Sequence, residues 1–181
     1  SAGVNVIDGV LAQDCSDLNF IFNHWIVHHS PLIATKMALT LDGKFAAASG
    51  HSQWVSGETA RADVMRWRRY FPAIAVGANT VQHDDPSLTS RIGNSIWCPR
   101  RFVFDRSLIT VSEPRWPQLY DDPYKQRTTV LCGATADGAR RDRLTAHGVS
   151  VWELPEVAGH LDWDVFRRRC AREALCGVYI E

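Results

Sequence analysis

Residues 73–80 read AIAVGANT, and this stretch indicates the class of fold. Four apolar residues in a row, ended by Gly77, are typical of a short buried strand. Ala78-Asn79-Thr80 then predicts a polar turn and a short helix, which ends before the turn signal Asp84-Asp85-Pro86. Strand, glycine, polar turn and helix in this order favour anion binding, because unpaired amides at the helix start face the turn.

The same alternation of strands and helices continues on both sides of this stretch. Ser56 is expected to cap a helix at residues 58–71, which has an apolar stripe of Ala60, Val64, Trp67 and Phe71. Further strands are predicted at residues 101–105, 128–132, 149–154 and 178–180, and further helices at residues 136–147 and 163–175. Strands separated by helices of this length predict an α/β fold with an open, mostly parallel sheet that is covered on both faces.

The first 41 residues predict a strand at residues 4–7, helical spacing at residues 11–22 and a clear strand at residues 31–41. The last of these has two unlike faces. The apolar face, expected in the core, carries Ile33, Met37, Leu39 and Leu41, and the small, polar face carries Ala34, Lys36, Ala38 and Thr40. The second face fits either packing against a helix or a cleft into which Lys36 points.

The composition excludes several classes of protein. The 181 residues are 45% hydrophobic with 20 Lys+Arg against 20 Asp+Glu, which fits one globular domain without the basic field of a nucleic-acid binder. No apolar run is long enough to span a membrane, and the start of the chain does not resemble a signal peptide. We therefore expect a cytoplasmic protein with no nucleic-acid or membrane partner.

The motifs of covalent and metal catalysis are absent from the sequence. The five cysteines form no CxxC pair, and the histidines lack the spacing of a helical zinc site. The sequence also lacks the dinucleotide GxGxxG, the P-loop, the nucleophile elbow GxSxG and the zinc-deaminase signature. No metal and no covalent nucleophile is therefore expected.

Three blocks, at residues 36–44 (KMALTLDGK), 49–56 (SGHSQWVS) and 77–91 (GANTVQHDDPSLTSR), carry a specific resemblance in their order and spacing. They resemble the reductase domain of the bifunctional riboflavin-biosynthesis deaminase/reductase, in which an arginine is kept at the position of Arg68. Residues 3–22 resemble the end of the deaminase domain of that family. The resemblance implies a connector at residues 1–30 and a reductase domain at residues 31–181 that lacks its last C-terminal elements.

The resemblance implies a dihydrofolate-reductase-like, three-layer α/β/α fold and a homodimer. It further implies that NADPH reduces the ribosyl group of 5-amino-6-(5-phosphoribosylamino)uracil to a ribityl group, with hydride added at C1′. Hydride chemistry belongs to the cofactor, so the protein has to supply positioning and electrostatics. Zinc would be confined to the deaminase domain, which this chain lacks.

By matching position, the resemblance assigns Lys36 to catalysis, where it would polarise a carbonyl or stabilise the reacting imine. The implied substrate contacts are Ser52, Arg68, Leu88, Arg91 and Glu181. The implied NADPH contacts are Ala38, Trp54, Thr80 and Asp84.

Two alternatives remain open from the sequence. One is another reductase of the same fold, such as the 2,5-diamino-6-ribosylaminopyrimidinone phosphate type or dihydrofolate reductase, against which the deaminase-like residues 3–22 speak. The other is a non-catalytic fragment that binds nucleotide or serves in assembly.

Overall fold

The computed structural model describes residues 3–48, 55–111 and 115–181. Its helices are α1 (Ala12–Leu18), α2 (Phe20–His28), α3 (Glu58–Tyr70), α4 (Ala78–Asp84), α5 (Gln118–Asp121), the 3-10 helix η1 (Lys125–Arg127), α6 (Gly138–Ala146) and α7 (Trp163–Arg172). Its strands are β1 (Leu32–Thr35), β2 (Ala73–Gly77), β3 (Ser90–Ile92), β4 (Ser95–Trp97), β5 (Arg100–Phe104), β6 (Thr128–Gly133), β7 (Ser150–Leu154), β8 (Glu156–Val157), β9 (His160–Leu161) and β10 (Gly177–Ile180).

Six of the strands form one sheet in the order β1-β10-β2-β5-β6-β7, and every neighbouring pair is parallel. β10 lies between β1 and β2, with Gly177 opposite Leu32 and Val178 opposite Ala73. Strands of a parallel sheet that is covered on both faces read as continuous apolar runs. Residues 73–76 and all six residues of β6 are accordingly buried.

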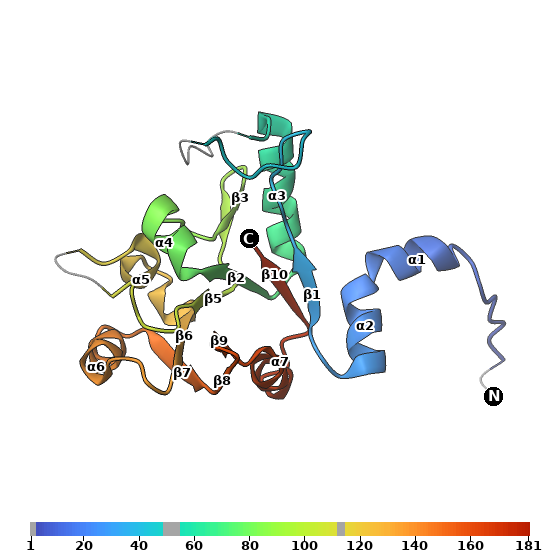
Figure 1. Cartoon of the computed structure of the whole chain (residues 1–181). Coiled ribbons are helices and arrows are strands. Elements are labelled where there is room, and N and C mark those ends of the chain that lie inside the picture. The colour runs from blue at the N-terminus through green and yellow to red at the C-terminus, as the bar shows by residue number, and fades with distance from the viewer. Residues whose placement is uncertain (1–2, 49–54, 112–114) are drawn as a thin grey trace.

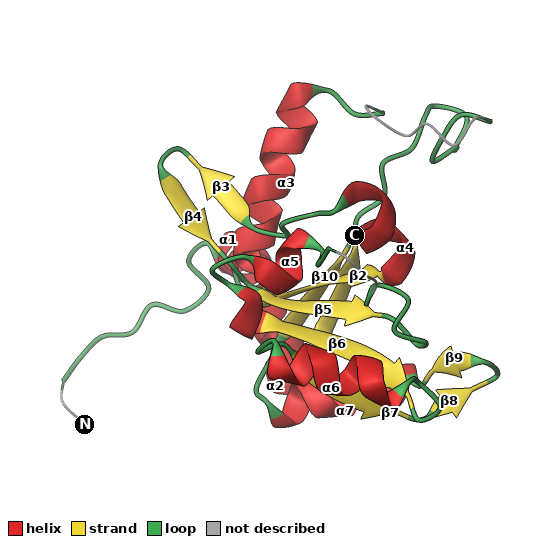
Figure 2. Cartoon of the chain, turned by 90° about the vertical axis from the view of Figure 1, so that its left-hand side faces the viewer, coloured by secondary structure: helices red, strands yellow, loops and turns green. Residues whose placement is uncertain are grey.

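The sheet separates two cores, which gives the three layers seen in Figures 1 and 2. On one face, α7 contributes Phe166 and Cys170 to a core that includes Ala73 and Ala75. On the other face, α4, α5 and α6 contribute Val81, Leu119 and Leu144, among others, to a core that includes Ile74 and Val76. The alternation along β2 follows the period of two in a strand. The predicted α/β fold, covered on both faces, is confirmed.

The strand predicted at residues 31–41 is shorter than expected. β1 ends at Thr35, and the Lys36 amide donates a last hydrogen bond to the Ile180 carbonyl at 2.9 Å. Beyond that bond the chain leaves the sheet, so Met37, Leu39 and Leu41 are exposed and do not join the core as predicted. The strand predicted at residues 4–7 is wrong as well, because these exposed residues pair with no other strand in the described structure.

The predicted cap of α3 is also wrong. Gly57 is the N-cap, with an extended backbone, and the Arg61 amide donates to its carbonyl. The helix therefore starts one residue later than a Ser56 cap requires, and the Ser56 carbonyl accepts from the Arg61 guanidinium instead. The helix itself is confirmed, as are the strand at residues 73–77 and, within two or three residues at their ends, the later elements.

Two antiparallel hairpins were not predicted. β3 pairs with β4 through the turn Gly93-Asn94, and β8 pairs with β9 through Ala158-Gly159. Both residues of the second turn have positive φ, 49° and 79°, as a two-residue type I′ turn requires. The hairpins lie outside the large sheet, and β3 packs against α3.

Gly177 provides a test of the close packing around β10. A Cβ at this position would lie 2.9 Å from Phe71 Cδ1 and 3.2 Å from Ile21 Cγ2. We expect Gly177→Ala to lower the free energy of unfolding by about 1–3 kcal/mol, because the added methyl overpacks a filled core. Urea denaturation measures the difference.

Gly138→Ala is the matched control, because nothing lies within 4 Å of a Cβ at this first position of α6. We expect unchanged stability or a gain of up to about 1 kcal/mol from helix propensity. Equal unfolding free energies for the two variants would contradict the packing argument.

Candidate functional site

The candidate site lies at the carboxyl ends of β1, β10 and β2. Because the strands are parallel, these ends meet at one edge of the sheet, where ligands of open α/β sheets bind. Lys36 directly follows β1 and Glu181 directly follows β10. The Glu181 amide donates to the Ala75 carbonyl at 3.0 Å, which fixes the backbone of Glu181 against β2.

A cleft of about 430 Å³ opens between this edge of the sheet and α3. Its lining includes Lys36 and Ala38 on the segment that leaves β1, Ala60 and Val64 on α3, and Tyr179 on β10. The alanines leave space that larger side chains would fill. Of the two interpretations of the small face of residues 31–41, the structure therefore supports the cleft.

Tyr179 is a cleft residue that sequence reasoning missed. It is only 5% exposed, and its ring stacks on that of Phe71 with a centroid distance of 5.3 Å. Burial and, second, the Glu181 carboxylate raise the pKa of its hydroxyl to about 12, so the phenol stays protonated and able to donate at neutral pH. Its spacing of two residues from Glu181 is the sequence signal that places both on one face of β10.

Arg68 and Glu181 form a two-pronged ion pair beside Tyr179. Arg68 Nε donates to Glu181 Oε1 at 2.8 Å, and Arg68 Nη2 donates to Glu181 Oε2 at 2.7 Å. Arg68 Nη1 donates to the Thr89 carbonyl at 2.7 Å. Both side chains of the pair are 11% exposed, and three of the five guanidinium N–H groups are engaged. The pair carries no net charge, and two of the Arg68 N–H groups have no acceptor among the residues that the structure describes.

The other predicted site residues lie away from the lining of the cleft. Leu88 is buried next to Thr89 and has a left-handed backbone, with φ 53°. Arg91 is exposed on β3. Thr80 is half-buried within α4, which begins at Ala78 directly after β2 and leaves no polar turn, and Asp84 is exposed at the last residue of α4.

Ser52 and Trp54 lie outside the described residues. The structure thus brings Lys36 and Ala38 together in the cleft and joins Arg68 to Glu181 at its border. Their predicted roles toward a substrate or a cofactor stay predictions.

Within residues 3–48, 55–111 and 115–181, no group of three or more His, Cys, Asp and Glu side chains is arranged to hold a metal ion. Among the helices of these same residues, none has both the length and the apolar character needed to cross a membrane.

The wholly parallel six-stranded sheet and the cleft at the carboxyl ends of its strands define the class as an open α/β domain. The chain belongs to the RibD C-terminal domain family, whose model matches residues 31–181. The resemblance inferred from the three sequence blocks is therefore confirmed. The match begins at Pro31, three residues after α2 ends at His28, but the division of the chain at residue 30 stays a prediction.

Relatives with known names agree with this membership. The riboflavin biosynthesis protein RibD of Bacillus amyloliquefaciens is 34% identical over 187 residues, which cover 99% of this chain and 47% of that protein. A structure of Acinetobacter baumannii RibD superposes with a TM-score of 0.77 at 26% identity, covering 99% of this chain and 47% of the other.

A third match is the Thermotoga maritima diaminohydroxyphosphoribosylaminopyrimidine deaminase/5-amino-6-(5-phosphoribosylamino)uracil reductase. It has a TM-score of 0.72 at 25% identity, covering 99% of this chain and 46% of the other. This chain therefore spans about half the length of the relatives that it matches.

The Arg68–Glu181 pair gives a prediction about stability. We expect Arg68→Leu to lower the free energy of unfolding by about 2–4 kcal/mol, because it leaves the Glu181 carboxylate largely buried without its cation. Urea denaturation at neutral pH measures the loss.

Arg106→Leu serves as the control, since its ion pair with Glu156 is much more exposed. An exposed pair contributes about 1 kcal/mol or less. A loss at Arg68 no larger than the loss at Arg106 would contradict the importance that we assign to the buried pair.

Proposed function

We propose that this chain carries the reductase activity in which NADPH reduces 5-amino-6-(5-phosphoribosylamino)uracil to 5-amino-6-(5-phosphoribitylamino)uracil, a step of riboflavin biosynthesis. The observation that carries the proposal is the family match over residues 31–181 of a chain whose structure places Lys36 and Glu181 at one edge of the sheet. The name of the Thermotoga maritima relative includes this reductase activity.

The cleft fits a planar cofactor ring on one side. Ala34, Ala38 and Ala60 line it and leave room for close approach, and Lys36 is its cationic lining residue. In the proposal, Ala38, Trp54, Thr80 and Asp84 contact NADPH, which when bound supplies the hydride that is added at C1′ of the opened sugar.

The protein's own contribution is electrostatic. The Lys36 ammonium lines the cleft, where in the proposal it polarises a carbonyl or stabilises the reacting imine as a positive charge beside the developing negative charge. Glu181 accepts hydrogen bonds from the ring or hydroxyls of the substrate, and Arg68 has two free N–H groups for the same ligand. Ser52, Leu88 and Arg91 complete the proposed substrate contacts, in a homodimeric enzyme.

Absorbance at 340 nm in the presence of NADPH and the pyrimidine substrate tests the proposed function. The 181-residue chain is assayed beside a form extended to the length of its relatives. Turnover by both forms supports the proposal and shows that this chain is sufficient, and turnover by the extended form alone supports it for the longer protein. The absence of turnover in both contradicts the proposal.

Lys36 gives a sharper prediction. We expect Lys36→Met to lower kcat by about 100-fold or more, because removing one fixed donor from a reaction centre typically costs that much. The long apolar side chain keeps the volume of the stem, so folding should be retained. Initial rates at saturating NADPH and substrate measure the loss.

Lys125→Met is the matched control, because Lys125 lies in η1 and not in the lining of the cleft. It should leave kcat within about twofold of the parent. Intact turnover in Lys36→Met would refute the catalytic role of Lys36 and leave the reductase assignment standing.

A further inference from the structure

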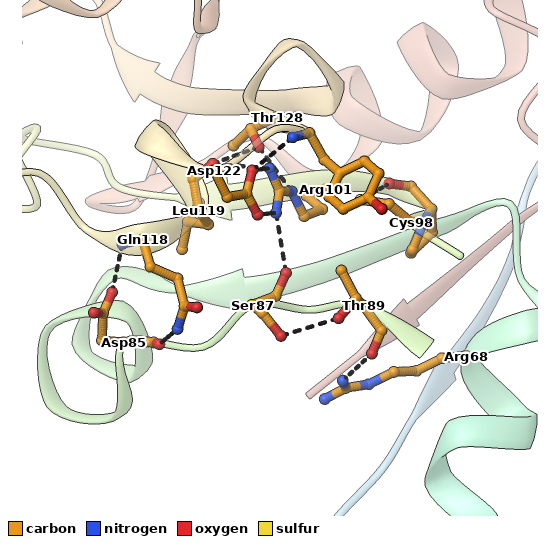
Figure 3. A network of polar contacts seen from close by, with 12 residues as sticks. Arg68, Asp85, Ser87, Thr89, Cys98, Arg101, Gln118, Leu119, Asp122 and Thr128 are labelled. Carbon is orange, nitrogen blue, oxygen red and sulfur yellow. Dashed lines mark hydrogen bonds and ion pairs between the residues drawn. The ribbon is translucent and has the colours of Figure 1, made fainter. Parts of the chain in front are cut away.

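Arg101 on β5 is fully buried, and all five of its N–H groups are engaged. Nη1 and Nη2 donate to the two carboxylate oxygens of Asp122 at 2.6 and 2.8 Å. Nε donates to Thr128 Oγ1 at 2.9 Å, and Nη2 also donates to the Leu119 carbonyl at 2.9 Å. The fifth bond runs from Nη1 to the Ser87 carbonyl at 3.0 Å. Figure 3 shows this arrangement.

The Ser87 bond connects Arg101 to the loop of residues 85–89, which joins α4 to β3. The same loop is held at its start by Gln118. The backbone N–H of Gln118 donates to Asp85 Oδ1 at 2.6 Å, and its side-chain Nε2 donates to the Asp85 carbonyl. Between these anchors and β3 lies Leu88 in its left-handed conformation. A residue other than glycine keeps such a backbone only where its surroundings determine it.

The loop continues directly to the candidate site. Ser87 Oγ lies 3.1 Å from Thr89 Oγ1, and the Thr89 carbonyl accepts from Arg68, which holds Glu181. Arg101 is therefore linked to Arg68 through the Ser87 carbonyl, the backbone from Ser87 to Thr89, and the Thr89 carbonyl (Figure 3). Arg101 on β5 donates to the Ser87 carbonyl and Arg68 on α3 donates to the Thr89 carbonyl, so the two arginines bind the loop at positions two residues apart.

We propose that Arg101, held by Asp122, is a positioning residue that fixes residues 87–89 in the conformation that places the Thr89 carbonyl against Arg68, and thereby orients Arg68 beside Glu181. Arg101 touches no ligand and acts through the Ser87 carbonyl. This inference rests on the proposed function, because it concerns Arg68 and Glu181, two of the proposed substrate contacts. A planar guanidinium suits the task, since it can serve the carboxylate and three other acceptors at fixed angles, which an ammonium cannot.

Arg101→Lys tests the proposal, because it keeps the charge near Asp122 and removes the planar fork. In the protein that remains folded, we expect KM for the pyrimidine substrate to rise about tenfold and kcat/KM to fall by about 10- to 100-fold, as misplaced binding groups do. KM for NADPH should stay within twofold. An anchor that served stability alone would lower the melting temperature without this selective rise in KM.

Arg100→Lys is the matched control. Arg100 precedes Arg101 on the same strand, but its ion pair is with Glu173, next to the end of α7. The control should leave both KM values unchanged. Asp122→Asn is a milder second variant for the case that Arg101→Lys fails to fold, because it keeps one oxygen for the guanidinium and removes the charge. It should raise KM for the pyrimidine in the same selective way.

Amide hydrogen exchange of the peptide that covers residues 85–91 gives a readout that needs no turnover. We expect faster exchange of this peptide in Arg101→Lys than in Arg100→Lys, with similar exchange in β6 and β7. Unchanged KM values together with unchanged protection of the loop would overturn the proposal. If neither the 181-residue chain nor its extended form turns over, the proposed function fails, and hydrogen exchange alone decides whether Arg101 holds the loop. If only the extended form turns over, the KM values are measured in that form.

Discussion

The site depends on the insertion of β10 between β1 and β2. This one placement gives β1 its hydrogen-bonding partner, brings Tyr179 under α3 and delivers Glu181 to Arg68, from which it is 113 residues distant in sequence. Without β10 the cleft would lack one of its walls, since Tyr179 is part of the lining. The carboxyl edge of the sheet is therefore a product of long-range pairing, which local sequence alone does not establish.

Buried guanidinium groups organise the surroundings of that edge. Arg68 and Arg101 each bind a carboxylate with two donors and a backbone carbonyl of the loop of residues 85–89 with a further one. Burying a cation is costly unless it is paired and its donors are satisfied, and Arg101 meets that condition with all five N–H groups. The loop is thereby held in place without regular secondary structure of its own.

The central strands could be predicted because their burial on both faces imposes a local pattern. Residues 73–77 are such a case, because the strand predicted there begins and ends at the same residues as β2 in the structure. On the apolar face of residues 31–41, the core placement predicted for Met37, Leu39 and Leu41 is wrong, because the period of two indicates which residues share a side but not where the strand ends. The dipeptide Gly93-Asn94 between two short segments is itself a hairpin signal in the sequence, since glycine tolerates the positive φ of a two-residue turn. The role of Arg101 had no local signal, since its acceptors come from four separate positions between residues 87 and 128. Likewise, the pairing of Arg68 with Glu181 follows only from the order of strands in the sheet.

The central position of β10 has a consequence for the folding of the chain. The strands β2, β5, β6 and β7 neighbour one another in the order of the sequence, so each can join the sheet after closing a comparatively short loop. β10 has to pair with β1 and β2, which both lie far before it in the sequence. Contacts between segments so distant in sequence form slowly. Until β10 pairs with them, β1 and β2 each present an unpaired edge, the kind of surface through which chains associate wrongly. The strand that completes the cleft thus also pairs the facing edges of β1 and β2, which leaves only the outer edges of β1 and β7 unpaired in the six-stranded sheet.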